Sequence, residues 1–543
     1  MLKHRPRIAY FCMEYGLESD FKLYSGGLGI LAGDYLKAAH ELNLPVIGIG
    51  LLWKQGYTQQ VLRNKKPVDC YPVYSYDFLQ DTGIKVKVRI RERDVFCKVW
   101  LVDKFDNAPL YLLDTALPEN DDPWITGQLY GWFSEERIAQ EMVLGIGGVR
   151  ALRALELEVD LYHFNEGHAA FAGLELISEK MEKDEMTFRE AWETTKEQIV
   201  FTTHTPIKEG NEEHPHSLLK YMGADHGLTL EQLVQIGGVP FNMTVAGLRL
   251  ARISNGVSQL HSQTAREMWQ EIPDHSKIIG ITNGVHRQTW VSKEIIAVHN
   301  DAEKLWATHL GLKKELLAYV EAKTGQQLRL DSLLIGFARR AAPYKRGDFI
   351  FSDQKVIAKL LAEGKIQIIF SGKAHPLDDN GKGIVTRQAE YARLYPESVV
   401  FLEDYNMEIG RYLTRGCDLW LNNPRRPKEA CGTSGIKAAM NGVLNFSVLD
   451  GWWAEACCHG ENGWQLGDGL AINDFTGSHP VKKQDQHDLD SLYQVLLEEI
   501  IPIYYEQRRK WIKMMQNSIE STYQTFSARR MLQDYYREMY EIK

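Results

Sequence analysis

Residues 429–437 bring three chemical groups together in one short segment. It reads Glu-Ala-Cys-Gly-Thr-Ser-Gly-Ile-Lys, a glycine-containing turn that leads into a helix. Thr433 and Ser434 are residue types that cap helices, and the exposed N–H groups at a helix start favour an anion such as phosphate. With Glu429 before the turn and Lys437 inside the helix, a carboxylate, a phosphate-sized nest and an amine lie together. A glycine-rich turn with a solvated lysine is the alternative interpretation.

Two other segments could hold phosphate. The loop at Gly26 and Gly27 leads into a helix and offers backbone N–H groups. It lacks the Gly-x-Gly-x-x-Gly order, so a nicotinamide cofactor is not favoured. Residues 339–346 follow an apolar run and contain four cations, among which arginine offers a bidentate fork and lysine a point charge. Each segment alone could also be a tight turn or a solvated basic loop.

Polar residues also follow other apolar runs, at 164–168, 202–206 and 281–286. We expect His204 to face a ligand, because open α/β sheets bind ligands beyond the carboxyl ends of their strands. His214 and His216 lie in an acidic loop without regular ligand spacing, so we expect no metal site. The pair Trp452-Trp453 could form a platform for a sugar, although such pairs are more often core.

The elements that must position these motifs are short apolar runs separated by helix-like stretches. The runs are 7–14, 44–52, 161–165, 199–204, 333–338, 366–370, 399–402, 418–422 and 443–449. This order predicts parallel sheets with helices on both faces. We therefore predict an α/β protein with two doubly wound Rossmann-like domains facing across a cleft that holds the site. Residues 84–103 largely alternate apolar and polar types, which indicates an antiparallel insertion.

The length of 543 residues is that of a chain with two large domains. We expect an N-terminal domain over 1–325 and a C-terminal domain over 326–510 that carries Lys437. The joint is placed at the polar stretch 323–331.

Composition excludes several classes of protein. The net charge is −9 and the basic residues are scattered, which argues against nucleic-acid binding. No apolar stretch approaches 18 residues and no signal peptide is recognisable, so we expect neither a membrane span nor export. The seven cysteines follow no regular spacing, which fits a reducing cytoplasm better than a disulfide framework.

Taken together, the segments resemble the α-glucan phosphorylases, the glycogen and maltodextrin phosphorylase family, and most closely its compact bacterial and archaeal branch. The resemblance runs from Ile-Ala-Tyr-Phe at 8–11 to Ser-Ala-Arg-Arg-Met-Leu at 527–532. Its most specific part is Asn-Asn-Pro-Arg-Arg-Pro at 422–427, followed by 429–437 and then by 441–445 and 449–453.

The resemblance implies a two-domain glycosyltransferase fold of the B type, with the N-terminal domain (1–325) on the glucan and phosphate side and with helices over 511–543 returning to that domain. It implies reversible cleavage of terminal α-1,4-linked glucose by inorganic phosphate, giving α-glucose 1-phosphate and a shortened glucan. The substrates would be an α-glucan or maltodextrin with phosphate, the cofactor pyridoxal 5′-phosphate, and a homodimer is the family expectation. The cofactor's phosphate, not its ring, takes part in the chemistry. The N-terminal extension of the animal enzymes, with its phosphorylation and nucleotide control, is missing, so we expect no such regulation.

The resemblance also assigns residues. Those matching cofactor contacts are Lys437 as the Schiff-base lysine, Thr433, Ser434, Gly26, Gly27 and Arg339, which stands in place of a lysine. Those matching groups that hold the substrate phosphate are Arg340, Lys345 and Gly27. Those matching groups around the terminal glucose are Glu429, Asn283 and His204. The catalytic set implied is Lys437, Arg340, Lys345, His204 and Glu429, and no metal is implied.

The residue types agree with this chemistry. Two phosphates brought close together repel, so a dense set of cations and helix N-termini is needed. Proton transfer between them can supply general acid catalysis, without the carboxylate pair of glycoside hydrolases. The sequence departs from the family at Cys431, Ile436, Ala342 and the charged pair at 208–209, and Pro343 stiffens its loop. Some of these changes could alter acceptor choice.

Two alternatives stay open. A nucleotide-sugar glycosyltransferase of the same fold, of the glycogen-synthase type, carries a second glutamate eight residues after the first, where this chain has Lys437. A non-catalytic glucan-binding relative is disfavoured by the intact set of Arg340, Lys345, Glu429 and Lys437. The preferred glucan and its length are not decided by the sequence.

Overall fold

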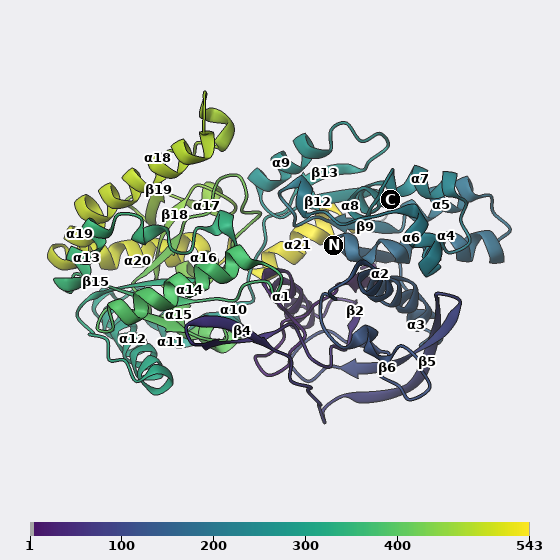
Figure 1. Ribbon diagram of the computed structural model, residues 1–543, viewed down its shortest axis with the longest axis horizontal. Helices are drawn as coiled ribbons and strands as arrows, with labels where there is room; N and C mark the ends of the chain where they lie inside the picture. Colours follow the sequence, from purple (N-terminus) through teal and green to yellow (C-terminus); the bar gives the residue numbers. More distant parts are fainter. Residues whose placement is uncertain (1–4, 542–543) are drawn as a thin grey trace. The chain divides into compact units, whose positions relative to one another are not determined.

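The computed structural model describes residues 5–541 and divides into two compact units. Unit 1 consists of Met1–Tyr57, Tyr71–Thr282 and Ala528–Lys543, and unit 2 of Thr58–Cys70 and Asn283–Ser527. Both are mixed α/β with parallel sheets, as predicted (Figure 1).

Unit 1 is built on a nine-stranded sheet in the order β13-β12-β9-β8-β1-β2-β7-β6-β5. Its strands are β1 (Ile8–Phe11), β2 (Val46–Leu51), β5 (Gln80–Ile90), β6 (Arg93–Val102), β7 (Leu110–Asp114), β8 (Leu161–Asn165), β9 (Ile199–Thr202), β12 (Ile253–Gly256) and β13 (Lys277–Gly280). The central strand β1 is parallel to both neighbours, with Ile8 opposite Val46 and Leu161. The four apolar runs predicted in this half are all strands.

The antiparallel insertion is also confirmed. Strands β5 and β6 pair antiparallel with each other, and β6 pairs antiparallel with β7. In β5 buried and exposed residues alternate towards its end. That alternation is the sign of a sheet with one face on the core and the other outward.

The helices of unit 1 are α1 (Gly27–Glu41), α2 (Ser134–Met142), α3 (Gly148–Ala154), α4 (Ala170–Lys183), α5 (Phe188–Lys196), α6 (His216–Met222), α7 (Leu230–Gly237), α8 (Met243–Leu250), α9 (Gln259–Trp269) and α21 (Ala528–Glu538). The last of these, in yellow in Figure 1, packs against α1. A buried polar chain fastens the C-terminal end of this unit: the Tyr540 hydroxyl lies 2.6 Å from both the Tyr35 hydroxyl and His163 Nδ1.

Unit 2 is built on a six-stranded parallel sheet in the order β16-β15-β14-β17-β18-β19. Its strands are β14 (Leu333–Ala338), β15 (Ile366–Ser371), β16 (Val399–Leu402), β17 (Leu419–Asn422), β18 (Leu444–Val448) and β19 (Gly463–Leu466). Every residue of β14 to β18 is buried. A sheet covered on both faces needs apolar residues throughout each strand, which is why these strands are visible in the sequence as continuous apolar runs.

The helices of unit 2 are α10 (Arg287–Trp290), α11 (Lys293–Val298), α12 (Ala302–Thr324), α13 (Gln354–Ala362), α14 (Asp379–Leu394), α15 (Met407–Gly416), α16 (Thr433–Met440), α17 (Trp453–Ala456), α18 (Pro480–Val495), α19 (Ile501–Glu506) and α20 (Arg508–Thr522). A hairpin of β3 (Gln59–Arg63) and β4 (Lys66–Cys70) belongs to the same unit. It packs on α14, with Lys382 paired to Asp69 at 2.7 Å.

The division differs from the boundaries that we expected. The joint falls before Asn283, not at 323–331, because α12 packs on α15 and α20 and buries Leu305 and Leu316 in the cores of unit 2. At the C-terminal end α20 stays with unit 2, where it packs on α16, and only α21 belongs to unit 1. A polar stretch at the end of a long helix is therefore no domain boundary here.

A buried ion pair ties α12 to the sheet of unit 2. Lys313 and Asp418 are both fully buried with Nζ and Oδ2 2.5 Å apart, and His309 Nε2 lies 2.9 Å from Asp418 Oδ1. We expect Asp418→Asn to lower the free energy of unfolding by about 3–5 kcal/mol, because it leaves the Lys313 charge buried without a counter-charge. Urea unfolding measures this, with the exposed Asp490→Asn as control. A loss no larger than that of the control would contradict it.

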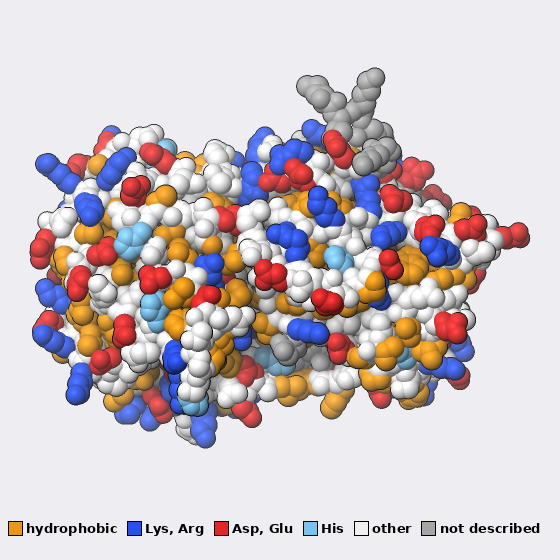
Figure 2. All heavy atoms as spheres, turned by 90° about the horizontal axis from the view of Figure 1, so that it is seen from above, with side chains coloured by type: hydrophobic (Ala, Val, Ile, Leu, Met, Phe, Trp, Pro, Cys, Tyr) orange, Lys and Arg blue, Asp and Glu red, His pale blue; other side chains and the backbone are white. Residues whose placement is uncertain are grey.

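Acidic and basic side chains are interspersed over the face shown in Figure 2, in keeping with the scattered charges of the sequence. All seven cysteines are free thiols. Among the described residues, no helix has the length and apolarity that crossing a membrane requires.

Candidate functional site

The candidate site of unit 2 lies at the carboxyl ends of three adjacent parallel strands. These strands lie side by side in the order β14-β17-β18. Arg339 directly follows β14, Asn422 is the last residue of β17, and Asp450 lies two residues after the end of β18. Glu429 follows in the loop after β17. The edge of an open α/β sheet at which strands end is where such folds bind ligands.

Glu429 is the centre of this cluster. It is buried, with its Oε2 atom 2.5 Å from Arg339 Nη2 and 3.2 Å from Lys345 Nζ. Burial acts to raise the pKa of Glu429, but the charges of Arg339 and Lys345 outweigh it and lower the pKa to about 2. Glu429 is therefore an ionised carboxylate at neutral pH. Its pairing brings together three of the residues predicted for the site.

Arg339 is held from several sides. It is buried, and its guanidinium donates to Asn422 Oδ1 at the end of β17 as well as to Glu429. Asn422 in turn donates to the Ser447 hydroxyl, at 3.2 Å. A guanidinium whose two terminal nitrogens donate to two fixed partners presents its charge in one orientation.

Helix α16 begins differently from the prediction. Thr433 and Ser434 are its first two residues, while the cap is Gly432 in the left-handed conformation, with φ of +82°. Only glycine adopts this conformation without strain, which is why the turn needs it. The Ser434 hydroxyl instead accepts a hydrogen bond from Trp420 Nε1, at 3.3 Å. The expectation that Thr433 and Ser434 cap the helix is therefore wrong.

Lys437 lies in the last turn of this eight-residue helix. Its side chain is buried, and its Nζ atom lies 3.4 Å from the centroid of the Trp290 ring. An aromatic face attracts an ammonium group through its quadrupole but carries no formal charge. Asn441 donates to the backbone carbonyl of Lys437, at 2.8 Å.

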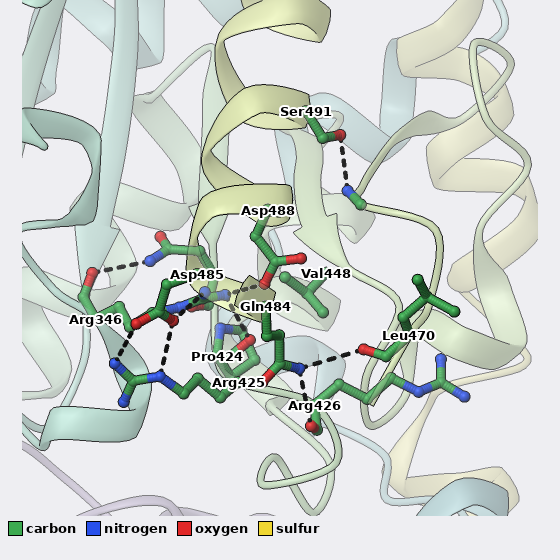
Figure 3. Close-up of polar contacts among 12 residues, drawn as sticks. Arg346, Pro424, Arg425, Arg426, Val448, Leu470, Gln484, Asp485, Asp488 and Ser491 are labelled. Atoms are coloured by element: carbon green, nitrogen blue, oxygen red, sulfur yellow. Dashed lines mark hydrogen bonds and ion pairs between the residues drawn. The ribbon is translucent and has the colours of Figure 1, made fainter. Parts of the chain in front are cut away.

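The loop that precedes Glu429 is clamped by α18 (Figure 3). Asp485 forms a bidentate pair with Arg425, both distances being 2.8 Å, and Asp488 accepts from Arg346 at 2.7 Å. Arg346 also donates to the carbonyls of Asn423 and Pro424. The two aspartates of α18 thereby fix residues 423–425: Asp485 binds Arg425 itself, and Asp488 binds Arg346, which donates to the carbonyls of Asn423 and Pro424.

Arg340 and Asn283 occupy different environments. Arg340 is exposed. The pKa of His375 is lowered first by the burial of His375 and second by the positive charge of Arg340. Asn283 is buried at the start of the second segment of unit 2.

The remaining predicted site residues belong to unit 1. Gly26 precedes α1 and Gly27 begins it. The Glu14 carboxylate accepts from the backbone N–H of Ser25 at 2.6 Å and of Gly26 at 3.1 Å, and from the Tyr130 hydroxyl at 2.5 Å. A Cβ atom on either glycine would have no neighbour within 4 Å. The loop thus offers open space for a ligand to approach its backbone.

His204 follows β9 and is fixed at two points. The backbone N–H of His204 donates to Glu166 Oε2 at 2.7 Å, and its ring Nε2 atom lies 2.7 Å from Asn165 Oδ1. Asn165 uses its amide nitrogen towards Cys12, so its oxygen accepts and Nε2 of His204 carries the hydrogen. Burial lowers the pKa of His204 to about 3. A neutral imidazole can hold hydroxyl groups but is no proton donor of acidic strength at neutral pH.

Three acidic residues near these motifs are absent from the predicted site residues. Glu166 lies in the polar segment 164–168 that the sequence marks, and Glu14 ends a predicted strand, but glutamates are too common for position alone to assign them a role. Asp450, which accepts from the backbone N–H of Glu429 at 3.0 Å, could have been suspected from its place after β18.

A further polar group in unit 1 joins Glu141, Glu212 and His214, whose potential ligand atoms lie within 4.8 Å of one another. Arg137 Nε lies 2.6 Å from Glu212, so a positive charge already occupies this group and competes with a metal ion. The Trp452-Trp453 pair is almost completely buried. It belongs to the core, and the idea of a sugar platform there is wrong.

Comparison with known proteins gives consistent matches. Residues 294–459 match the family model described as carbohydrate phosphorylase. The chain is 37% identical to the maltodextrin phosphorylase of Thermococcus litoralis, over 99% of this chain and 71% of that protein. It is 34% identical to the glycogen phosphorylase of Aquifex aeolicus, over 99% of this chain and 86% of that protein. An uncharacterised protein of Methanocaldococcus jannaschii is 35% identical over 98% of this chain and 99% of its own length.

Proposed function

Because this chain belongs to the carbohydrate phosphorylase family, we propose that it cleaves terminal α-1,4-linked glucose from an α-glucan with inorganic phosphate. The products are α-glucose 1-phosphate and a glucan shortened by one glucose, and the reaction is reversible. The observation that carries the proposal at the level of the site is the buried amine of Lys437, eight residues after the ion-paired carboxylate of Glu429. A nucleotide-sugar transferase of the same fold would need a carboxylate at 437.

The phosphorylase family is generally dependent on pyridoxal 5′-phosphate, and the residues present fit that cofactor. A primary amine can hold its aldehyde covalently as a Schiff base, and Lys437 supplies one in a buried position against an uncharged ring. Thr433 and Ser434, as the first residues of α16, place their N–H groups where a phosphate can be held. Arg339 would add positive charge to it. When bound, the cofactor supplies a phosphate group that can exchange a proton with the substrate phosphate.

Arg340 and Lys345 would hold the substrate phosphate. The Lys345 ammonium has three donors, so its 3.2 Å contact with Glu429 leaves it able to contact a phosphate as well. Exposure of Arg340 keeps it reachable by an incoming anion. Holding the nucleophile close to the sugar turns a bimolecular encounter into an oriented reaction.

Glu429, Asn283 and His204 would hold the terminal glucose. The ionised Glu429 accepts hydrogen bonds from sugar hydroxyls, and the neutral His204 orients others without giving up a proton. In the reaction the bond from the anomeric carbon to the glycosidic oxygen breaks, and a bond to a phosphate oxygen forms. The proton of that phosphate ends on the released glucan hydroxyl.

The site as a whole needs both units. We place Gly26, Gly27 and His204 of unit 1 opposite the Glu429 cluster of unit 2 across a cleft, as in the B-type glycosyltransferases. Gly27 would then offer its backbone N–H to the substrate phosphate. A homodimer and a cytoplasmic location complete the proposal, and free thiols at all seven cysteines are consistent with that location.

The test is a panel of maltodextrins, glycogen and starch, each incubated with the protein loaded with pyridoxal 5′-phosphate and with inorganic phosphate. We expect glucose 1-phosphate to form in proportion to glucan shortening. Release of a nucleotide diphosphate from ADP-glucose or UDP-glucose, with no glucose 1-phosphate formed, would overturn the proposal in favour of a nucleotide-sugar transferase.

A further inference from the structure

Asp450 lies on the turn that follows β18 and is almost completely buried. One of its oxygens, Oδ2, accepts the backbone N–H of Glu429 at 3.0 Å, and the other, Oδ1, accepts the backbone N–H of Gly451 at 2.9 Å. Each carboxylate oxygen therefore has its own backbone donor, one in the Glu429 loop and one in the turn itself. This carboxylate bridges two segments that are 21 residues apart in sequence.

The same two segments touch at a second point. The N–H of Trp452 donates to the carbonyl of Cys431, at 3.0 Å. Gly451 has φ of +53°, and a Cβ atom there would lie 2.3 Å from the carbonyl oxygen of Cys431, so the turn tolerates no side chain at this position. The close approach leaves Asp450 little room to change its position relative to Glu429.

Glu429 is thus held from both ends. Arg339 and Lys345 hold its carboxylate, and Asp450 holds its backbone nitrogen. Helix α18 reaches the same region, because Gln484 donates to the carbonyl of Arg426 at 3.2 Å (Figure 3). The Arg426 guanidinium in turn donates to the carbonyl of Leu449. The backbone on which Glu429 stands is therefore tied to the neighbouring strand end.

We propose that Asp450 is a positioning residue, which fixes the backbone of Glu429 so that the Glu429 carboxylate meets the terminal sugar in a productive orientation. The inference rests on the proposed function, and it assigns to the buried Asp450 a role that is exerted through Glu429. Asp450 holds the backbone of Glu429 most firmly when the Asp450 carboxyl group is ionised, since both of its oxygens then act as strong acceptors of N–H donors.

The charge of Asp450 changes in the range where the protein would work. Burial, and next the Glu429 carboxylate, raise the pKa of Asp450 to about 7, against the two backbone hydrogen bonds and the charge of Arg426. The cations of Arg339 and Lys345 also lie near Asp450, because both are paired with Glu429, whose backbone Asp450 holds. The ionised form of Asp450 therefore becomes the major form as the pH rises above about 7.

The experiment compares Asp450→Asn and Asp450→Ala with the wild-type protein, all loaded with pyridoxal 5′-phosphate. Asparagine keeps the volume and one acceptor oxygen, so we expect kcat for glucose 1-phosphate formation to fall about 10–100-fold in Asp450→Asn and further in Asp450→Ala. The KM for phosphate should stay within about threefold, because other residues hold the phosphate. The ratio of wild-type kcat to that of Asp450→Asn should rise as the pH increases through about 7.

Asp485→Asn is the matched control, because Asp485 holds the same loop through Arg425 without touching Glu429. Any loss that it causes should be the same at each pH, as for a purely structural role. Unchanged kcat in both Asp450 variants, or a wild-type to variant ratio that stays flat from pH 6 to 8, would overturn the inference. A wild-type protein that forms no glucose 1-phosphate would instead refute the proposed function, so the two failures are distinguishable.

Discussion

Lys437→Ala is expected to remove both the absorbance band of the bound cofactor and phosphorolysis. Lys437 is the buried amine of α16, and alanine offers nothing that can hold an aldehyde covalently. Because the cofactor phosphate would serve as acid catalyst, activity should fall by about 10²–10⁴-fold or more. A visible or near-ultraviolet spectrum after loading with pyridoxal 5′-phosphate reads out binding independently of activity.

Two variants make this result interpretable. Lys437→Arg keeps a positive charge near the Trp290 ring but forms no such linkage, so it should also lack the band. Lys355→Ala removes an exposed lysine of α13 and should retain band and activity. Thermal melting confirms that each variant is folded. A band of wild-type intensity in folded Lys437→Ala would show that another lysine holds the cofactor.

Glu429→Gln is expected to cause the second large loss of activity. The substitution keeps size and shape but leaves Arg339 and Lys345 without the negative charge that they share at 2.5 and 3.2 Å. The glucose would lose a charged acceptor, and the cations would turn towards the phosphates. We expect kcat/KM for the glucan to fall by about 10²–10³-fold, measured as initial rates of glucose 1-phosphate formation. Glu461→Gln, at an exposed position, is the control.

The same variant has a defined pH signature in stability. The pKa of Glu429 is lowered from 4.5 to about 2, so its ionised form stabilises the fold fully above about pH 4.5. That contribution is lost as the pH falls towards 2. The difference in free energy of unfolding between wild type and Glu429→Gln should therefore shrink over this window. A difference that is constant with pH would mean that the ion pair does not control the charge of Glu429.

Much of the fold was predictable because of how parallel sheets are buried. Strands such as β14 and β8 need apolar residues on both faces, and their predicted bounds, 333–338 and 161–165, agree with the structure. The alternation in 84–103 likewise marked an antiparallel pair. What failed was the joint at 323–331, since a polar helix end carries no information about which sheet that helix covers.

The sequence by itself determined the membership of the family, the nine strands that its apolar runs predict and the motif at 429–437, because these depend on local residue order and on burial patterns repeated along the chain. Strands β7, β12, β13 and β19 were not predicted. The tertiary structure alone decided which residues the side chain and backbone of Glu429 contact. Glu429 pairs with Arg339 across 90 residues, and the backbone of Glu429 is held by Asp450. The hairpin at 58–70 joins unit 2. These contacts depend on the order of strands within each sheet, here β14-β17-β18, and no local pattern encodes which strand ends become neighbours. The ionisation of Glu429 and Asp450 follows from those neighbours, and so could be known only after the chain was folded.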